Sequence, residues 1–541
     1  YPNVILPTDS GRTANLLYQV DGNPYEGPIP RYYIIMREIE RAELHQLSSK
    51  SPDAMSNAKM NATWISRDGI EKNGKIQYRY NAGIRNRGNG TRVDNPHNYH
   101  VAIPSDRRWK EMEGINLNAR YSYSQVLGSA IFQKAGVLCA NSKFAELRVN
   151  SRNLMGPGVG ISYGLYAANE QYNNRLVKRH WPDDPEGNLY RGYGYKADFS
   201  WHGDDFLSTN SYTNYYFKEN HAREKDYSDL ISLCGVLSVI PEYSTDETYV
   251  SRVREVLDVE EWMRYMAANT LLRNDETCLA NGSGDDYGLY RGVNDPRFRV
   301  IAYDSDSLMG WGRYESLPEK GIWSMTNLVS LNRFMKHPEF TPIYLNYLKT
   351  FSETLFSPGQ MDPFLDQILG GKIPQDTITK MKRFNSNQVH YVLGQFSQKL
   401  TLESSFATNK GFLYTTNSSI SLSGKGDGTR TRNVYVNEVQ SLWTPWKCEW
   451  GLENIDLNPG MNKFIVRAVG LDNREIERMT VDIWYDTSAV REQGGVLAVD
   501  TVWTAAEGPY RVTSGLTVPA GVTLRIEAGT TVYMNPDLNL I

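Results

Sequence analysis

Aspartates recur between residues 275 and 306 in an arrangement that could hold a divalent cation. They are Asp275, Asp285, Asp286, Asp304 and Asp306. Asp304 and Asp306 are two residues apart, so a strand that continues through them directs both carboxylates to one face. Two such charges about 4 Å apart repel by roughly 4 kcal/mol at an effective dielectric near 20. A bound cation would offset that repulsion, and oxygen ligands suit Mg²⁺, Mn²⁺ or Ca²⁺. The alternative is a solvated acidic loop that binds no ion.

The residues before the first of these aspartates predict a helix. Asp258 is placed to cap it, and Glu261 follows three residues later, as in a capping box. Apolar residues between Val259 and Met266 recur at helical spacing and give the helix one apolar face. We expect this helix to run out in residues 271–276, which places Asp275 at its end.

Two predicted strands lead to the other aspartates. A polar, glycine-rich loop at residues 281–286 is followed by residues 287–291, which read as a strand. After a turn at Asp295 and Pro296, the apolar run 298–303 predicts a second strand. That strand delivers residues 304–306, so the helix, loop and strands together would gather the carboxylates.

A second candidate is the turn Arg87-Gly88-Asn89-Gly90-Thr91-Arg92. It follows residues 61–65 and 76–85, which alternate like the strands of a hairpin. Glycines let backbone amides approach an anion, and the flanking arginines can pair with phosphate. The turn therefore predicts a phosphate site, with a plain hairpin loop as the alternative.

Taken together, these motifs make the sequence similar to the CotH (spore-coat protein H) kinase family. The matching segments are Asp275, residues 286–290, residues 303–306 with Gly310, the turn at 87–92, and residues 114–119, 164–170 and 187–191. The resemblance covers about residues 30–400. It implies an atypical protein-kinase-like fold with two lobes that binds ATP and a divalent metal.

The resemblance also implies roles for the aspartates. Asp275 matches the catalytic aspartate of the family. Asp304 matches the metal-binding aspartate, and Asp306 stands beside it. Asp286 replaces the family's asparagine, which leaves it able to ligate metal but adds a charge.

Three further residues match positions that the resemblance assigns to cofactor binding. Arg87 belongs to the glycine-rich turn. Glu170 is expected to pair with a cation that binds phosphate. Arg191 replaces the family's lysine and keeps its charge. A structural salt bridge is the alternative for Glu170 and for Arg191.

The sequence departs from the family at the strand that follows the turn. The family has lysines there, whereas residues 96–103 contain none. A kinase needs a cation near the phosphates of ATP. Arg85, Arg87 and Arg92 are the substitutes that the sequence offers, and it does not choose among them.

Composition limits the classes of partner. The chain has 541 residues, 58 basic and 62 acidic side chains and a net charge of −4, which predicts no nucleic-acid affinity and no polybasic membrane patch. No apolar stretch approaches the roughly 18 residues of a membrane span. The four cysteines form no CxxC pair, so no zinc site or disulfide framework is expected.

The fold class expected is α+β with four segments. They are an extended segment at 1–30, a CotH kinase-like domain at 31–403, a β-sandwich at 404–487, and a linker with the first coils of a right-handed parallel β-helix at 488–541. Residues 325–335, 342–353, 361–369 and 375–400 have helical apolar spacing and would form a helical lobe. Short strands with Gly and Asn turns favour an Ig-like or fibronectin-like sandwich after residue 403.

The last segment and the first residue both suggest a longer native protein. Very short strands separated by glycine turns are typical of a β-helix, which needs several coils for stability. We therefore expect the chain to continue beyond Ile541. Because it begins at Tyr1 without a signal peptide, we expect a processed chain or a fragment.

The sequence thus predicts a secreted or surface-exposed bacterial protein whose first domain uses ATP and Mg²⁺, or Mn²⁺ or Ca²⁺, as a phosphotransferase. Its acceptor would be a protein with Ser or Thr hydroxyls, and self-assembly or surface partners are expected. One alternative is a catalytically dead structural or adhesive component. The other is a metal-dependent glycosyltransferase in which the DxD motif holds a sugar nucleotide, although residues 1–150 show no βαβ repeat.

Overall fold

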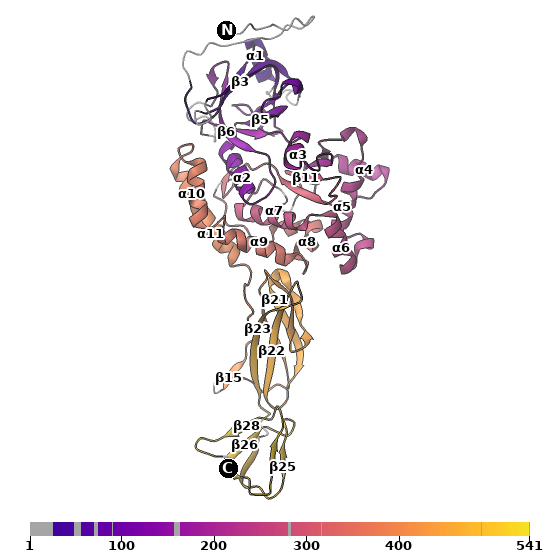
Figure 1. Cartoon of the computed structure of the whole chain (residues 1–541), viewed down its shortest axis with the longest axis vertical. Coiled ribbons are helices and arrows are strands. Elements are labelled where there is room, and N and C mark those ends of the chain that lie inside the picture. Colours follow the sequence, from indigo (N-terminus) through magenta and orange to yellow (C-terminus); the bar gives the residue numbers. More distant parts are fainter. Residues whose placement is uncertain are drawn as a thin grey trace. The chain divides into compact units, whose positions relative to one another are not determined.

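The structure is a computed structural model that describes residues 25–47, 56–69, 74–88, 90–155, 163–277, 279, 283–314, 316–409, 412–487, 490–539 and 541. Most of the segment predicted at 1–30 lies outside these residues, as do Asn89 and Cys278. The chain divides into two units (Figure 1). The first comprises Tyr1–Met335 with Tyr347–Gln395, and the second Lys336–Asn346 with Phe396–Ile541.

The first unit begins with an eight-stranded sheet in the order β1-β2-β3-β4-β5-β8-β6-β7. Its strands are β1 (Arg31–Ile35), β2 (Met60–Arg67), β3 (Ile76–Asn86), β4 (Tyr99–Ala102), β5 (Gly114–Asn118), β6 (Ser142–Val149), β7 (Arg152–Asn153) and β8 (Tyr166–Glu170). A parallel pairing of β1 with β6 joins distant strands of this order, so the sheet closes like a barrel. The antiparallel pair of β2 and β3 confirms the predicted hairpin.

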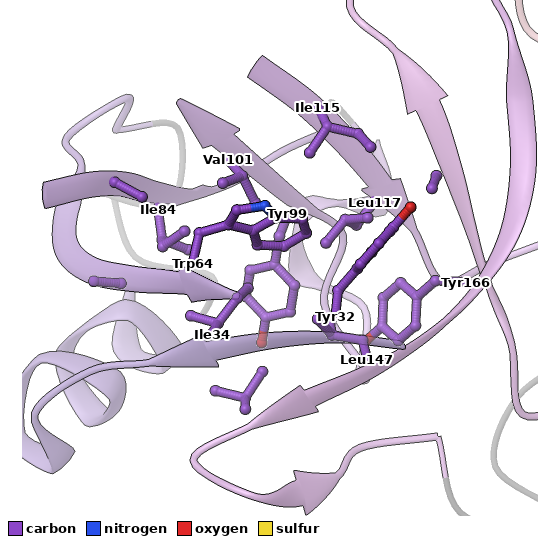
Figure 2. Packing of buried hydrophobic residues seen from close by; sticks show 14 of the residues in the cluster. Tyr32, Ile34, Trp64, Ile84, Tyr99, Val101, Ile115, Leu117, Leu147 and Tyr166 are labelled. Carbon is purple, nitrogen blue, oxygen red and sulfur yellow. The ribbon is translucent and has the colours of Figure 1, made fainter. Parts of the chain in front are cut away.

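Aromatic side chains fill the interior of this sheet (Figure 2). The ring of Trp64 is fully buried and lies 4.8 Å from that of Tyr32 and 5.6 Å from that of Trp109. The indole of Trp109 donates a hydrogen bond to Ser66 Oγ at 2.7 Å. This packing holds the strands in register, and α2 (Ser122–Lys134) packs against β6 and β8.

A second sheet follows in the order β10-β9-β11-β12. Its strands are β9 (Asn188–Gly192), β10 (Tyr216–Lys218), β11 (Tyr287–Arg291) and β12 (Phe298–Ala302). The predicted strands at 287–291 and 298–303 are confirmed as an antiparallel pair. Pairing of β9 with β11 brings Arg191 beside Gly288, so two segments about a hundred residues apart share one sheet.

The predicted helix before Asp275 is α7 (Val259–Leu272). Asp258 caps it as expected, accepting a hydrogen bond from the backbone N–H of Glu261 at 3.1 Å. Arg273 ends it in the left-handed conformation at φ 47°. The buried face of α7 packs against β12, which fixes residues 273–277 relative to the strand that carries the DxD motif.

Other helices lie wholly or partly in the first unit, since residues 336–346 belong to the second. They are α1 (Glu38–Gln46), α3 (Asn174–His180), α4 (Phe206–Thr213), α5 (Ser228–Ser238), α6 (Asp246–Val256), α8 (Val329–Lys336), α9 (Thr341–Glu353), α10 (Pro358–Leu369) and α11 (Gln375–Leu393). The helices predicted after residue 325 are confirmed, although α11 stops at Gly394 instead of continuing to residue 400. Glycine lowers helix stability at that point. Helix α11 packs against α7 and α10.

The second unit contains two sheets around one core. The larger has the order β15-β16-β23-β22-β18-β19 and the smaller β17-β21-β20. Their bounds are β15 (Ala407–Asn409), β16 (Phe412–Thr415), β17 (Ser419–Lys425), β18 (Thr431–Val436), β19 (Val439–Gln440), β20 (Leu442–Thr444), β21 (Glu449–Asp456), β22 (Gly460–Gly470) and β23 (Glu475–Tyr485). Leu422 and Trp450 of the smaller sheet share a hydrophobic cluster with Val434 and Val466 of the larger.

Parallel strands form the end of the chain. Strands β24 (Arg491–Val496), β26 (Tyr510–Thr517) and β28 (Val532–Met534) pair in that order, and β25 (Thr501–Trp503) pairs with β27 (Leu524–Ile526). Trp503 and Tyr510 stack inside, with ring centroids 4.6 Å apart. The Ig-like and β-helix assignments stay predictions for these two regions.

Helices of the described residues include none long and apolar enough to cross a membrane. Cys139, Cys234 and Cys448 are buried and free.

The first turn of α7 generates a test of stability. Burial raises the pKa of Glu261 to about 7 from an ordinary 4.5, against the opposing charge of Arg299. The folded chain therefore holds this proton more tightly, so the contribution to stability is full below pH 4.5 and is lost as the pH rises through about 7. We expect Glu261→Gln to flatten the fall in melting temperature between about pH 5 and pH 8, by roughly 2–4 °C.

Glu260→Gln is the matched control, because Glu260 is the exposed neighbour on the same helix. Differential scanning fluorimetry across this pH range measures both variants. A Glu261→Gln profile that falls as steeply as that of the unmodified protein would contradict the assignment.

Candidate functional site

A cavity of about 780 Å³ in the first unit brings the two sequence motifs together. Its basic lining residues are Arg85, Arg87, Arg92, Arg120, Arg191 and Arg313. Its acidic lining residues are Glu276, Asp285, Asp286, Asp304 and Asp306. Cavities of this size are typical of small-molecule sites. Basic and acidic side chains therefore line the same cavity, and they come from several parts of the sequence.

The DxD segment reaches this cavity through a turn. The condition that the strand continue through Asp304 and Asp306 is not met, because β12 ends at Ala302 and Asp304 adopts φ 51°. Gly312, at φ 127°, lets the chain fold back, and the N–H of Arg313 donates to the carbonyl of Asp306 at 2.9 Å. Both aspartates nevertheless line the cavity.

The acidic side of the cavity carries uncompensated like charge. Burial raises the pKa of Asp304, Asp306 and Asp286, and the charge of Asp304 raises the values of the other two further. Arg87 acts in the opposite direction on Asp304, and Gln125 donates a hydrogen bond to Asp306 Oδ1. Protons are held more tightly than usual here mainly because burial disfavours the charged carboxylates, and at Asp286 and Asp306 also because of the charge of Asp304.

The donor chemistry fits a hard divalent cation. Asp304, Asp306 and Asp286 line the cavity with carboxylate oxygens, the ligands that hard divalent cations prefer. Across the part of the chain that the structure describes, no three His, Cys, Asp or Glu side chains are gathered closely enough to hold a metal. The charge of Asp304 acts on the carboxyl groups of both Asp306 and Asp286 and raises their pKa values.

Two arginines of the cavity lining, Arg85 and Arg87, donate to neutral oxygens, whereas Arg120, Arg191 and Arg313 pair with carboxylates. Arg85 donates to the carbonyl of Asn86 at 3.1 Å, and Arg87 donates to the amide oxygen of Asn118. Within the described residues, neither Arg85 nor Arg87 has a carboxylate oxygen within 4.0 Å, the distance that an ion pair requires. Burial and the charges of Arg92 and Arg87 lower the pKa of Arg85. An anion in the cavity would relieve this crowding of positive charge.

Glu170 lies beside the cavity and not in it. It lines an adjoining pocket of about 70 Å³ together with Arg87 and Asp304. Its carboxylate pairs with Arg179 and accepts hydrogen bonds from the backbone and side-chain amides of Asn141. Burial alone would raise the pKa of Glu170, but its contacts with His180, Asn141 and Arg179 lower it. Its ion-pair partner is therefore an arginine of α3.

Arg191 lines the cavity but is also tied to its neighbours. Its guanidinium pairs with Glu219 at 3.3 Å and donates to the hydroxyl of Tyr303 at 3.2 Å. The rings of Tyr193, Phe217 and Tyr303 surround it at centroid distances of 6.0, 5.4 and 5.5 Å. Arg191 therefore packs against the aromatic rings of the cavity wall and also contributes a positive charge to it.

Asp275 does not line the cavity, whereas its neighbour Glu276 does. The carboxylate of Asp275 is buried between Lys320 Nζ, 2.6 Å away, and Arg273 Nε, 2.9 Å away. Glu276 pairs with Arg313 at 3.0 Å, and burial followed by the charge of Asp304 raises its pKa to about 7.

Sequence reasoning missed several residues of the site. It named neither Glu276 nor the lining residues Arg120, Arg313 and Gln125. The adjacency of Glu276 to Asp275 was a usable signal, since consecutive residues at a helix end point in different directions. Arg313 and Gln125 carried no such signal, because only the tertiary fold brings them to the aspartates.

Comparison with known proteins gives one family match. The family model described as CotH kinase protein matches residues 84–393. Among solved structures, the proinflammatory kinase CtkA of Helicobacter pylori is 9% identical, with 56% of this chain and 92% of that chain covered. The TM-score is 0.27, too low to establish a shared fold. No curated protein matches the sequence.

The turn after the DxD motif generates a second prediction. A Cβ at Gly312 would come within 2.0 Å of the carbonyl oxygen of Asp306, at a φ that side chains rarely adopt. We expect Gly312→Ala to cost about 1–3 kcal/mol of stability, because the turn that holds Asp306 must shift. Gly359→Ala on α10 is the control, since a Cβ there meets nothing within 4 Å. Equal melting temperatures for the two variants would contradict the expectation.

Proposed function

We propose, from the premise that this chain belongs to the CotH kinase protein family, that its first unit binds ATP with a divalent cation and transfers a phosphoryl group to a protein hydroxyl. One observation carries the proposal. Arg85 and Arg87 line the cavity and have no carboxylate ion pair among the described residues, and aspartates with raised pKa values line the same cavity. A metal–triphosphate complex supplies the charge that each side lacks.

Arginines can supply the positive charge of the lysine that residues 96–103 lack. Arg85 and Arg87 lie at the end of β3, where the glycine-rich turn begins, and both face the cavity. Guanidinium groups bind phosphate oxygens with two parallel hydrogen bonds, so two or three arginines can hold a triphosphate that a lysine holds in other kinases. We therefore assign the phosphates to Arg85 and Arg87.

Asp304 and Asp306 would hold the cation, and Asp286 would add to the negative charge around it. When bound, a divalent cation neutralises charge that develops on the transferred phosphoryl group. The side chains themselves bind and orient the nucleotide. Gln125 holds Asp306 in place by its hydrogen bond, and Arg87 sets the charge balance at Asp304.

Asp275 is proposed to orient the acceptor. In the transfer, the acceptor oxygen forms a bond to the γ-phosphorus, the bond from that phosphorus to the bridging oxygen breaks, and ADP leaves. The hydroxyl proton passes to the carboxylate of Asp275. Serine and threonine side chains of a protein are the acceptor class, and the acceptor would reach Asp275 past Glu276.

A catalytically silent scaffold is the second candidate. The observation that favours it is the position of Asp275, whose two carboxylate oxygens are each bonded to a cation outside the cavity lining. Such a protein would bind nucleotide without transferring phosphate. Its β-rich segments would then carry the structural role.

We also propose the finer assignments for the remaining chain. Two sheets that share one core support an Ig-like sandwich at 404–487, and parallel strands stacked in successive coils support a β-helix from 488 onward. The domain boundary near residue 403 and a secreted or cell-surface location belong to the same proposal. Modules of this kind are common in extracellular proteins that assemble at surfaces.

The test compares nucleotide binding with transfer. Isothermal titration with ATP and Mn²⁺ should show binding, and Asp304→Ala should abolish the part that depends on metal. Arg85→Met should weaken ATP binding about 10-fold or more, because it removes a charge-assisted contact to phosphate. Labelled ATP then reports transfer to the protein itself or to added Ser/Thr peptides.

Arg333→Met and Asp246→Ala are matched controls, because these two residues form an exposed ion pair on α8 and α6. Binding without transfer would support the scaffold. Binding of UDP-sugars in place of ATP would support a glycosyltransferase. Equal labelling of the unmodified protein and Asp304→Ala would contradict the metal role.

A further inference from the structure

Lys320 is a buried lysine whose ammonium group is directed to the proposed catalytic carboxylate. Its side chain is 8% exposed, and Nζ donates to Asp275 Oδ1 at 2.6 Å. Arg273 donates to the other oxygen, Oδ2, at 2.9 Å. Burying an ammonium group is costly unless it is paired and hydrogen-bonded. The fold therefore places this charge at a particular acceptor.

One buried amide fixes the backbone of Lys320. Gln388 on α11 is fully buried. Its Oε1 accepts from the N–H of Lys320 at 2.8 Å, and its Nε2 donates to the carbonyl of Lys320 at 3.0 Å. The same Nε2 donates to the carbonyl of Thr270 at 3.0 Å, in the last turn of α7. Gln388 thus links Lys320 to α7, which ends at Leu272, three residues before Asp275.

The loop that carries Asp275 is held from its other side by side chains of α7. Asn274 bonds Asn269 through both its backbone N–H and its side-chain amide, each at 3.1 Å. The hydroxyl of Tyr265 contacts that of Thr277 at 2.8 Å. With the loop anchored at both ends, the remaining freedom of Asp275 is the rotation of its carboxylate, which is a soft torsion.

The segment after the DxD motif supplies cations to two consecutive carboxylates. Arg313 reaches Glu276 at 3.0 Å, and Lys320 reaches Asp275 at 2.6 Å. The residues that follow the proposed metal ligands therefore also hold the residues proposed to meet the acceptor. The lysine absent from the strand after the glycine-rich turn is not replaced by Lys320, since Lys320 contacts a carboxylate and does not line the cavity.

We propose that Lys320, held by Gln388, is a positioning residue that fixes the carboxylate of Asp275 for the acceptor hydroxyl. The inference rests on the proposed function. An ionised carboxylate has about four lone-pair sites. Lys320 and Arg273 each bond one of the two oxygens of Asp275, which fixes the plane of the carboxylate. Catalysis by a fixed acid–base group depends on such alignment.

The test separates positioning from binding and from folding. Lys320→Met removes the charge and keeps the length, Lys320→Arg keeps the charge, and Lys382→Met on α11 removes a lysine whose 2.6 Å ion pair with Asp366 lies elsewhere. We expect Lys320→Met to bind ATP and Mn²⁺ like the unmodified protein while its transfer rate falls about 100-fold. Lys320→Arg should recover most of that loss, and Lys382→Met should lose none.

A second measurement needs no activity. Hydrogen–deuterium exchange should show lost protection at residues 273–277 in Lys320→Met and none in Lys382→Met, since only the first loosens the loop. Unchanged protection there, or an unchanged transfer rate in Lys320→Met, would overturn the proposal. If the unmodified protein binds no nucleotide, the proposed function fails, and the exchange result still decides whether Lys320 orders the loop.

Discussion

The carboxylates of Asp286, Asp304 and Asp306 repel one another in a partly buried site, and the cavity is arranged around that cost. Burial and mutual charge raise their pKa values, so without a cation the site holds protons more tightly than free aspartates do. Like charges at close range cost several kcal/mol in such surroundings. A fold that keeps them together does so through rigid neighbours, here β12, the turn at Gly312 and the amide of Gln125.

Arg85 and Arg87 present the converse case, because their positive charges have no carboxylate ion pair among the described residues. Arg85 and Arg87 come from the end of β3, whose place in the barrel is fixed by its pairing with β2 and β4. The aromatic interior around Trp64 makes that barrel stiff (Figure 2). Packing of the core therefore fixes where Arg85 and Arg87 enter the lining of the cavity. A cavity lined by both positive and negative side chains attracts a ligand that carries both positive and negative charge, as a metal–triphosphate complex does.

The sequence predicted the elements better than their contacts. Local signals were sufficient for the cap at Asp258, the hairpin before Arg87 and the strand before Asp304, since each depends on neighbours within a few residues. The left-handed turn at Asp304 was not predictable, because it depends on Gly312 folding back onto Asp306. The partners of Glu170 and Asp275, Arg179 and Lys320, lie in other elements. Such pairs are set by tertiary packing, which periodicity does not encode.

In the proposed function, nucleotide binding and phosphoryl transfer would depend on different parts of this structure. The charges that would hold a nucleotide all line the cavity and come from β3, the turn that follows it, and the segments around Asp286 and Asp304. The alignment of Asp275 comes instead from Lys320 and Gln388, which are buried behind it. Because the two sets share no side chain, a substitution in one need not disturb the other. A protein with the proposed site could therefore keep nucleotide binding while losing transfer, and the contacts of Asp275 are where that difference would arise.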